Sequence, residues 1–369
     1  MKPDICPEIR GIVTDMKINI PPFIKAGSCI GVTAPSFGCT IEPYISKFAA
    51  AKKIIEGKGY SVKAGDTVYK SDGLGISTDP ETCTRELESF YLDDSISAII
   101  SAGGGEMMCE TAACMDFEKL KGKAKWFMGY SDNTNFIFPL VTICHTAAIY
   151  GPCISGFGKK WEQSEKDAFG LLEGRVKSVK GYEKFQLPQD DIVPEKDFEN
   201  FTYNLTAEKV LSVFTGGTGG TLQKNCSNKV SMDGILLGGC LDVLALLCGT
   251  KLDRVKDFME CLGNKKIIWV LESCDGNPME IRRQIWHLNN ASWFSYTAGF
   301  LIGRPLASFG QEMMGVNQYN AVTDILKDLN VPVVMDCDIG HIDPAMPLVM
   351  GADTHVEVKG NNIEINFNI

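Results

Sequence analysis

The sequence lacks a long hydrophobic run near its start and lacks any cluster of basic residues. Residues 1–22 carry scattered charges without a continuous apolar stretch, so we expect neither a secretory signal nor a membrane anchor there, and we expect a cytoplasmic protein. The formal net charge is -10, and no run of Lys and Arg reverses it locally. Binding to nucleic acid polymers or to a membrane surface is therefore not expected.

Metal-binding cysteine pairs are absent and histidines are few. The 14 cysteines lie mostly inside apolar stretches, and none forms the Cys-x-x-Cys spacing of a zinc site. We therefore expect buried, reduced thiols, no bound metal and no cofactor. The chain has only 4 histidines, which limits the choice of a general base.

What the sequence does have is the size and composition of a two-domain globular protein. It holds 369 residues, of which 44% are hydrophobic and 22% are charged, and a chain of this length exceeds one comfortable core. The pattern divides into an N-terminal extension (1–24), an α/β domain (25–168), an interdomain crossing or insert (169–232) and a C-terminal domain (233–369).

The first half alternates short apolar runs with amphipathic stretches, the pattern of a parallel sheet covered by helices. The expected strands are 28–34, 60–64, 97–101 and 125–128, and the expected helices are 45–58, 78–91, 106–115 and 135–146. We predict a flavodoxin-like or Rossmann-like parallel sheet here.

The second half resumes the alternation after an irregular segment. The expected strands are 234–238, 266–271, 298–303 and 331–335, the expected helices are 241–247, 278–288 and 320–329, and the last thirty residues alternate as antiparallel strands do. We predict a mixed α/β, barrel-like C-terminal domain. The glycine cluster at 215–220 lacks a following Gly-Lys-Ser/Thr, which favours a flexible turn over a phosphate loop.

The candidate nucleophile is Ser131, in the segment Gly129-Tyr130-Ser131-Asp132. An apolar strand runs into this corner and a helix follows it, so the hydroxyl would stand clear of the backbone and the next amides could bind an oxyanion. Gly-x-Ser also occurs in many loops, and the closing glycine of the usual nucleophile elbow is missing. The glycine turn at 103–105 ends a neighbouring strand, at the edge where open parallel sheets bind ligands.

The candidate base is His341, on a loop bounded by Gly340 and Pro344 beyond the strand at 331–335. The alternative interpretation is that His341 is simply an exposed histidine in a turn. We place His145 within an apolar helix and His287 near the end of an amphipathic one, where packing or capping roles are typical, and His355 in the alternating C-terminal run.

The candidate acid is Glu272, which directly follows the most apolar strand of the second half. A carboxylate at the tip of a buried strand is costly unless it is paired. Asp275 and Glu280 are nearby alternatives, and an interdomain salt bridge is the structural alternative for Glu272 itself.

With these three residues the chain resembles the LD-carboxypeptidase family of serine peptidases, which includes the microcin C self-immunity peptidases. The matching segments follow in order along nearly the whole chain: Ile24-Lys25-Ala26-Gly27, Ala34-Pro35-Ser36, Gly104-Gly105, Gly129-Tyr130-Ser131-Asp132, Gly238-Gly239, Leu271-Glu272, Gly303-Arg304, Gly340-His341, Pro344, Pro347-Leu348 and Gly351.

The resemblance implies a catalytic triad in which Ser131 is the nucleophile, His341 the base and then the acid, and Glu272 the residue that orients His341. It also implies an oxyanion hole made of the backbone N–H groups of Gly105 and Asp132, and a homodimer. Gly104, Trp161 and Arg304 are candidate substrate contacts, and Arg282 and Arg283 are further candidate cationic anchors.

The expected reaction is hydrolysis of an amide in a small peptide or peptide-nucleotide substrate, through an acyl-enzyme on Ser131. The turn continues Glu106-Met107-Met108, and Ala102 stands where peptidoglycan-cleaving relatives carry an arginine, which leans toward the immunity-peptidase branch. A ligand-binding protein on the same fold and an acyl transferase using the same serine are the alternatives.

Overall fold

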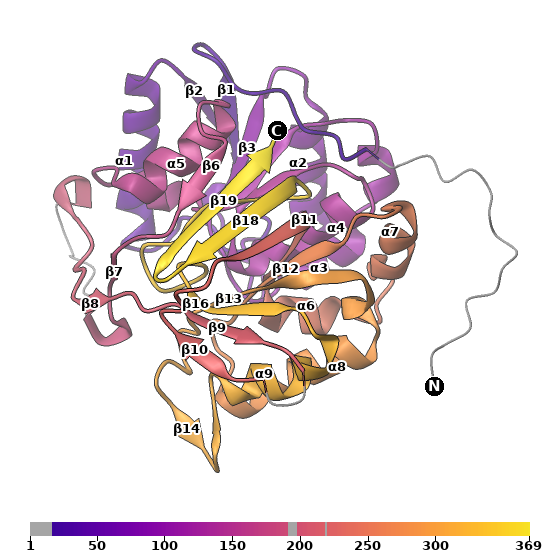
Figure 1. Cartoon of the computed structure of the whole chain (residues 1–369). Coiled ribbons are helices and arrows are strands. Elements are labelled where there is room, and N and C mark those ends of the chain that lie inside the picture. The colour runs from indigo at the N-terminus through magenta and orange to yellow at the C-terminus, as the bar shows by residue number, and fades with distance from the viewer. Residues whose placement is uncertain (1–16, 191–197, 218–219) are drawn as a thin grey trace, which may run out of the picture.

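The computed structural model describes residues 17–190, 198–217 and 220–369, and builds them into two large sheets with helices packed on them (Figure 1). Residues 1–16 of the predicted N-terminal extension lie outside the described residues, as do Thr218 and Gly219 of the glycine cluster. Within the described ranges, no helix combines the length and the apolar character needed to cross a membrane.

The first sheet has six strands in the order β17-β5-β4-β3-β1-β2. All are parallel except β17, which comes from the far end of the sequence and pairs antiparallel with β5. Its strands are β1 (Cys29–Thr33), β2 (Ser61–Ala64), β3 (Ala98–Ser101), β4 (Trp126–Gly129), β5 (Ala148–Tyr150) and β17 (Leu348–Met350). The accompanying helices are α1 (Tyr44–Gly57), α2 (Pro80–Leu92), α3 (Met108–Cys114), α4 (Thr134–Thr142) and α5 (Gln163–Leu172).

The second sheet has nine strands in the order β10-β9-β16-β13-β12-β11-β18-β19-β6. Its strands are β6 (Ser178–Lys180), β9 (Ser212–Thr215), β10 (Leu222–Lys224), β11 (Val230–Cys240), β12 (Ile267–Glu272), β13 (Thr297–Gly303), β16 (Pro332–Cys337), β18 (Asp353–Lys359) and β19 (Asn362–Asn368). The accompanying helices are α6 (Leu241–Leu247), α7 (Val255–Cys261), α8 (Pro278–Asn290) and α9 (Asn320–Leu326). The four central strands are parallel and the outer pairs antiparallel, so the sheet is mixed.

Two small two-stranded sheets complete the strands: β7 (Lys184–Phe185) with β8 (Ala207–Glu208), and β14 (Glu312–Met313) with β15 (Val316–Asn317). The predicted crossing at 169–232 holds β7 and β8 and also sends β6, β9 and β10 to the second sheet. Strands β9 and β10 pair antiparallel at the edge of the second sheet.

The mixed α/β fold with parallel-rich sheets is confirmed, and most predicted elements lie within one to three residues of their expected bounds. Local chemistry explains the well-placed helix starts. Asp79 caps α2 by accepting the Thr82 N–H at 2.8 Å, and Pro80 occupies the first helical position. Strand β12 is buried along its whole length, as expected of a central parallel strand.

One predicted helix was too long. The helix expected over 135–146 ends at Thr142, and His145 lies in the turn that follows with a φ of 51°, so its predicted place within a helix was wrong. The Ile143 N–H bonds to the Pro139 carbonyl four residues back, as in an α-helix, whereas the Cys144 N–H bonds to the same carbonyl five residues back. This wider turn ends the helix.

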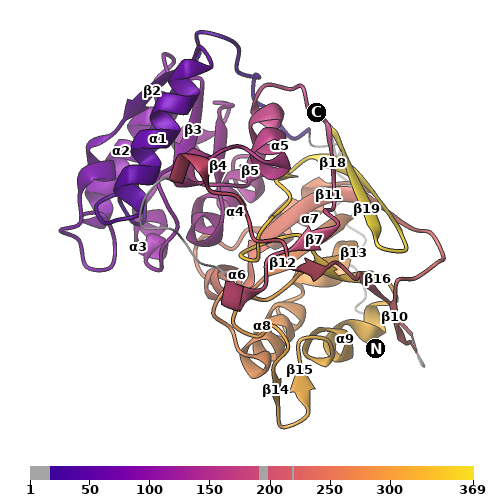
Figure 2. The same ribbon diagram turned by 90° about the vertical axis from the view of Figure 1, so that its left-hand side faces the viewer.

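Helix α4 joins the two sheets. It contacts β4 and β5 on one side and β11 and α6 on the other, and Figure 2 shows it between the two sets of strands. The ring of Phe138 stacks on Trp293 with centroids 5.1 Å apart, and Trp293 in turn stacks on Trp269 of β12. Phe138 and Trp293 are buried, so this aromatic stack is part of a continuous core.

We expect Phe138→Ala to lower the free energy of unfolding by about 3–5 kcal/mol, because the substitution removes a fully buried ring and leaves a cavity between the sheets. Urea denaturation monitored by tryptophan fluorescence measures the change. Met314→Ala, at a side chain that is 95% exposed, is the control and should change stability by less than about 0.5 kcal/mol. A loss below about 1 kcal/mol for Phe138→Ala would contradict the joining role of α4.

Candidate active site

Ser131 lies at the corner where β4 ends and a short 3-10 turn, Ser131–Asn133, leads into α4. Its φ of 62° is in the left-handed region, which is unfavourable for a residue with a Cβ and is held here by surrounding contacts. One such contact comes from the Asn133 side-chain amide, which donates to the carbonyls of Gly103 at 2.9 Å and Tyr130 at 3.0 Å. The serine corner is therefore tied directly to the neighbouring glycine turn.

The glycine turn packs against Ser131 so closely that it requires glycine. A Cβ added at Gly104 would lie 3.2 Å from the Ser131 Cβ and 3.4 Å from its Oγ. Gly105 has a φ of 155°, and a Cβ there would lie 2.0 Å from the Ser36 Oγ. Gly104 can thus lie close beside Ser131, and Gly105 close against Ser36, because both side chains are absent.

The Asp132 carboxylate fastens this corner to the rest of the first domain and is itself buried. It accepts hydrogen bonds from Ser36 Oγ at 2.6 Å, the Met108 N–H at 2.9 Å and the Asn135 side chain at 2.8 Å. Burial raises the pKa of Asp132, and these three bonds oppose that effect. The Asp132 side chain is therefore structural, while its backbone N–H belongs to the corner beside Ser131.

Glu272 and His341 form a hydrogen-bonded pair in the second sheet. The Glu272 carboxylate ends β12, and its Oε2 lies 2.8 Å from His341 Nδ1. The Glu272 side chain is 0% exposed and that of His341 is 11% exposed. Glycines again allow the close approach: a Cβ at Gly340 would lie 2.5 Å from Glu272 Oε2, and one at Gly303 would lie 2.8 Å from Glu272 Cβ.

The pair shifts the protonation of His341. Burial by itself lowers the pKa of the imidazole, but the charge of Glu272, together with hydrogen bonds to Cys274 and Glu272, outweighs burial and raises the pKa of His341 well above its ordinary value. The histidine is thereby held in one orientation with Nδ1 toward the acid, which leaves Nε2 for another partner.

Contacts between the two halves bring these groups to one place. The ring of Tyr130, next to Ser131 in sequence, lies 5.1 Å from the ring of His341. The hydroxyl of Tyr150 accepts the Ser131 N–H at 3.0 Å and donates to Glu272 Oε1 at 2.5 Å. Sequence reasoning missed Tyr150, because a tyrosine at the end of a short apolar strand carries no local pattern that distinguishes it from a packed ring.

The alternatives to Glu272 and His341 have other roles. Glu280 completes a capping box at the start of α8, and Asp275 is exposed. His287 is exposed on α8, and His355 on β18 lies 2.7 Å from Asp233.

Two predicted substrate contacts are engaged inside the protein. The Arg304 side chain is 2% exposed, donates to the Asp336 carbonyl at 2.7 Å and to Asp338 at 2.5 Å, and stacks on Phe185. Arg304 therefore supports the loop that leads to His341, in place of the substrate contact predicted from the sequence. Trp161 packs on Phe169 and donates to a backbone carbonyl of its own turn, which supports a packing role.

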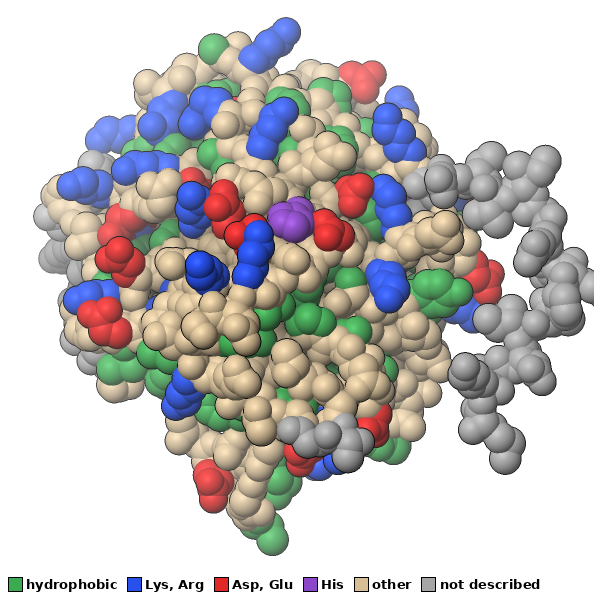
Figure 3. All heavy atoms as spheres, in the orientation of Figure 1, with side chains coloured by type: hydrophobic (Ala, Val, Ile, Leu, Met, Phe, Trp, Pro, Cys, Tyr) green, Lys and Arg blue, Asp and Glu red, His purple; other side chains and the backbone are tan. Residues whose placement is uncertain are grey.

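The other candidate anchors are also paired. Arg282 contacts Asp324 and a backbone carbonyl of α9, and Arg283 lies 3.8 Å from Glu280. On the face seen in Figure 3, Lys and Arg side chains are interspersed with Asp and Glu over β18 and β19, where Lys229 pairs with Glu357 and Lys265 with Asp353.

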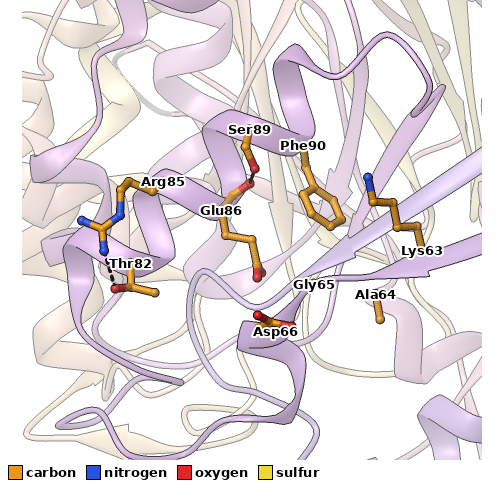
Figure 4. Close-up of a pocket in the computed structure, with 9 residues that line it drawn as sticks. All are labelled: Lys63, Ala64, Gly65, Asp66, Thr82, Arg85, Glu86, Ser89 and Phe90. Carbon is orange, nitrogen blue, oxygen red and sulfur yellow. Dashed lines mark hydrogen bonds between the residues drawn. The ribbon is translucent and has the colours of Figure 1, made fainter.

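A separate surface hollow of about 440 Å³ lies between β2 and α2 (Figure 4). Several of its polar side chains have partners: Arg85 donates to Thr82 at 2.7 Å, and Glu86 accepts the Thr67 N–H at 3.1 Å. The hollow shares no residue with the serine corner or with the Glu272–His341 pair. In the part of the chain that the structure describes, no group of three or more His, Cys, Asp and Glu side chains could hold a metal ion.

A serine corner beside a glycine turn thus lies on one sheet of this α/β protein, and a buried carboxylate–imidazole pair lies at the end of a strand of the other. The chain belongs to the LD-carboxypeptidase family. The family's N-terminal domain matches residues 30–151 and its C-terminal domain matches residues 233–356.

Known proteins of this fold are distant relatives. The microcin C7 self-immunity protein MccF of Escherichia coli is 20% identical over 95% of this chain and 97% of its own length. A protein of Bacillus subtilis strain 168 named "Probable murein peptide carboxypeptidase" is 22% identical over 90% of this chain and 89% of its own. The solved structure of MccF in complex with aspartyl sulfamoyl adenosine matches with a TM-score of 0.74 at 17% identity, covering 94% of this chain and 98% of the other.

The geometry of the pair predicts how stability depends on pH. Because the folded-state pKa of His341 is raised, the stabilisation from Glu272 is complete below the unfolded-state pKa of about 6.5 and is lost as pH rises through the folded-state pKa. We expect Glu272→Gln to destabilise the protein by about 1–3 kcal/mol near pH 6 and by less near pH 9.

Urea denaturation of both proteins across this pH range measures the difference. Glu364→Gln, which breaks an exposed pair with Lys180, is the control and should cost less than about 0.5 kcal/mol without this trend. A Glu272→Gln difference that grows with pH would contradict the pairing.

Proposed function

We propose that the protein is a serine peptidase or amidase in which Ser131 attacks the substrate carbonyl, His341 moves the proton and Glu272 orients His341. The observation that carries the proposal is the buried hydrogen bond between Glu272 and His341 Nδ1. The Tyr150 hydroxyl connects this pair with the strained Ser131 corner. A buried carboxylate that holds one imidazole nitrogen leaves the other free to act as a base.

In the proposed reaction the neutral form of His341, which is present above its raised pKa, takes the Ser131 hydroxyl proton at Nε2 as Oγ bonds to the substrate carbonyl carbon. The negative oxygen of the tetrahedral intermediate accepts hydrogen bonds from the backbone N–H groups of Gly105 and Asp132. His341 then gives its proton to the leaving amine, the C–N bond breaks, and an acyl-enzyme remains on Ser131. Water, deprotonated by His341, attacks the ester and releases the acid.

The proposed substrates are small peptides or aminoacyl conjugates of a nucleotide. Membership of the family supports amide hydrolysis, and the relatives supply the two substrate types to test: one is named a murein peptide carboxypeptidase, and MccF was solved with aspartyl sulfamoyl adenosine. Since Arg304 is buried and paired with Asp338, the proposal does not use it to bind an acidic group of the substrate.

Ser131→Ala tests the nucleophile. We expect the kcat for hydrolysis of an LD-linked tetrapeptide or of aspartyl sulfamoyl adenosine to fall by about 10³–10⁶-fold, because the variant lacks the hydroxyl on which the proposed acyl-enzyme forms. A fluorophosphonate probe should add its mass to the wild-type protein and not to the variant.

Ser46→Ala, in α1, is the matched control and should keep both the activity and the adduct. Hydrolysis by Ser131→Ala at the wild-type rate would remove the proposal. Binding of these compounds without any adduct on the wild type would favour a binding protein, and products formed only with an added amine would favour a transferase.

Gly105→Ala tests the oxyanion hole. The added Cβ would lie 2.0 Å from the Ser36 Oγ at a φ of 155°, so the turn and Ser36 must move relative to each other. We expect kcat to fall by about 10²–10³-fold, the usual cost of losing one oxyanion donor. Gly57→Ala, where nothing lies within 4 Å of the added Cβ, is the control. A wild-type kcat in a folded Gly105→Ala variant would place the oxyanion elsewhere.

A further inference from the structure

Tyr150 ends β5 in the first sheet, and its side chain is buried, with 2% of the residue exposed. Its hydroxyl lies 3.0 Å from the Ser131 backbone nitrogen and 2.5 Å from Glu272 Oε1. One phenolic oxygen therefore contacts both the backbone of the serine corner in the first sheet and the acid of the second.

The direction of these two hydrogen bonds follows from the chemistry of the groups. A backbone N–H can only donate, so the Tyr150 oxygen accepts from Ser131. The single hydroxyl proton of Tyr150 is then free for Glu272, whose ionised carboxylate can only accept. Glu272 Oε2 is occupied by His341 Nδ1 at 2.8 Å, so each carboxylate oxygen has one partner.

The result is a chain of hydrogen bonds from the Ser131 N–H through the Tyr150 hydroxyl and the Glu272 carboxylate to the His341 imidazole. Bonds in such a chain polarise one another inside a protein. The chain also fixes the serine corner, because its first bond holds the N–H of the residue whose φ is 62°.

We propose that Tyr150 is a positioning residue of the Ser131, Glu272 and His341 site: its hydroxyl holds the serine corner against the second sheet and sets how strongly Glu272 attracts the imidazole proton. The proposal rests on the function proposed above. Tyr150 acts through its neighbours, because its hydroxyl contacts the serine backbone and the acid and not the reacting oxygen.

The hydroxyl keeps its proton under the conditions that matter. Burial, followed by the charge of Glu272, raises the pKa of Tyr150 well above its ordinary value, so it remains a donor at neutral and moderately alkaline pH. The groups that face His341 are Glu272 and Cys274 from the end of β12 and its following loop, the Tyr130 ring from the serine corner, and Glu106 from the glycine turn.

Tyr150→Phe removes only the hydroxyl. Without that donor the Glu272 carboxylate is less stabilised and more basic, so it should hold the His341 proton more tightly. We expect the pKa of His341, followed by NMR of isotopically labelled histidine, to rise by about 0.5–1. We also expect kcat to fall by about 10–100-fold with little change in KM, as for other residues that orient an active group.

The chain offers favourable conditions for this measurement. There are only 4 histidines, so the His341 signals can be assigned by their loss in His341→Asn. Tyr91→Phe is the matched control: Tyr91 of α2 is 1% exposed and packs on Phe136, so the same atom is removed from an equally buried ring outside the site. It should leave the His341 titration and kcat unchanged.

Two further measurements keep the proposal open to refutation. In a Glu272→Gln background, Tyr150→Phe should have little additional effect on the His341 titration, because the two changes act through the same bond. Should Tyr150→Phe fail to fold, 3-fluorotyrosine at position 150 retains the hydroxyl as a stronger donor and should lower the pKa of His341.

An unchanged or lowered His341 pKa in folded Tyr150→Phe, or an equal shift in Tyr91→Phe, would overturn the proposal. The titration needs no turnover. If the wild type hydrolyses no amide, the proposed function fails while the NMR result still decides whether Tyr150 controls the Glu272–His341 pair.

Discussion

The buried charge of Glu272 is the constraint on which the candidate site depends. An ionised carboxylate that is 0% exposed is tolerated only with partners for both oxygens, and here those partners come from different parts of the fold. His341 arrives on the loop after β16, and Tyr150 arrives from the first sheet. The surrounding backbone also accommodates this carboxylate, because a side chain at Gly303 or Gly340 would clash with Glu272.

Much of the architecture was predictable from local patterns. The apolar run before Glu272 indicated a central strand, and a carboxylate at its tip was expected to be paired, although Asp275 and Glu280 stayed open as alternatives for the acid. His341 could be singled out because Gly340 and Pro344 stop the preceding strand. The helix starts were equally readable, since Asp79 with Pro80 and Asn277 with Pro278 carry capping chemistry within a few residues.

What could not be predicted depends on partners distant in sequence. Strand β17 pairs with β5 across about two hundred residues, and no local signal in Leu348–Met350 announces that pairing. From the sequence alone, Tyr150 is indistinguishable from a packed core ring, because its partners Glu272 and Ser131 are distant in sequence or bonded through the backbone. Arg304 was predicted to contact substrate because it is an arginine next to a motif. In the structure it forms an ion pair with the buried Asp338.

Helix α4 links the packing between the two sheets to the geometry of the candidate site. Its first residue, Thr134, accepts the Cys240 N–H at 3.0 Å through Oγ1, and a Cβ at Gly239 would lie 2.6 Å from that same oxygen. Four residues along, Phe138 stacks on Trp293 of the second domain. The helix that begins at the serine corner is therefore the one clamped onto the second sheet. Any shift between the sheets must move Ser131 relative to Glu272, so the aromatic core between them supports the alignment of the candidate site as well as stability.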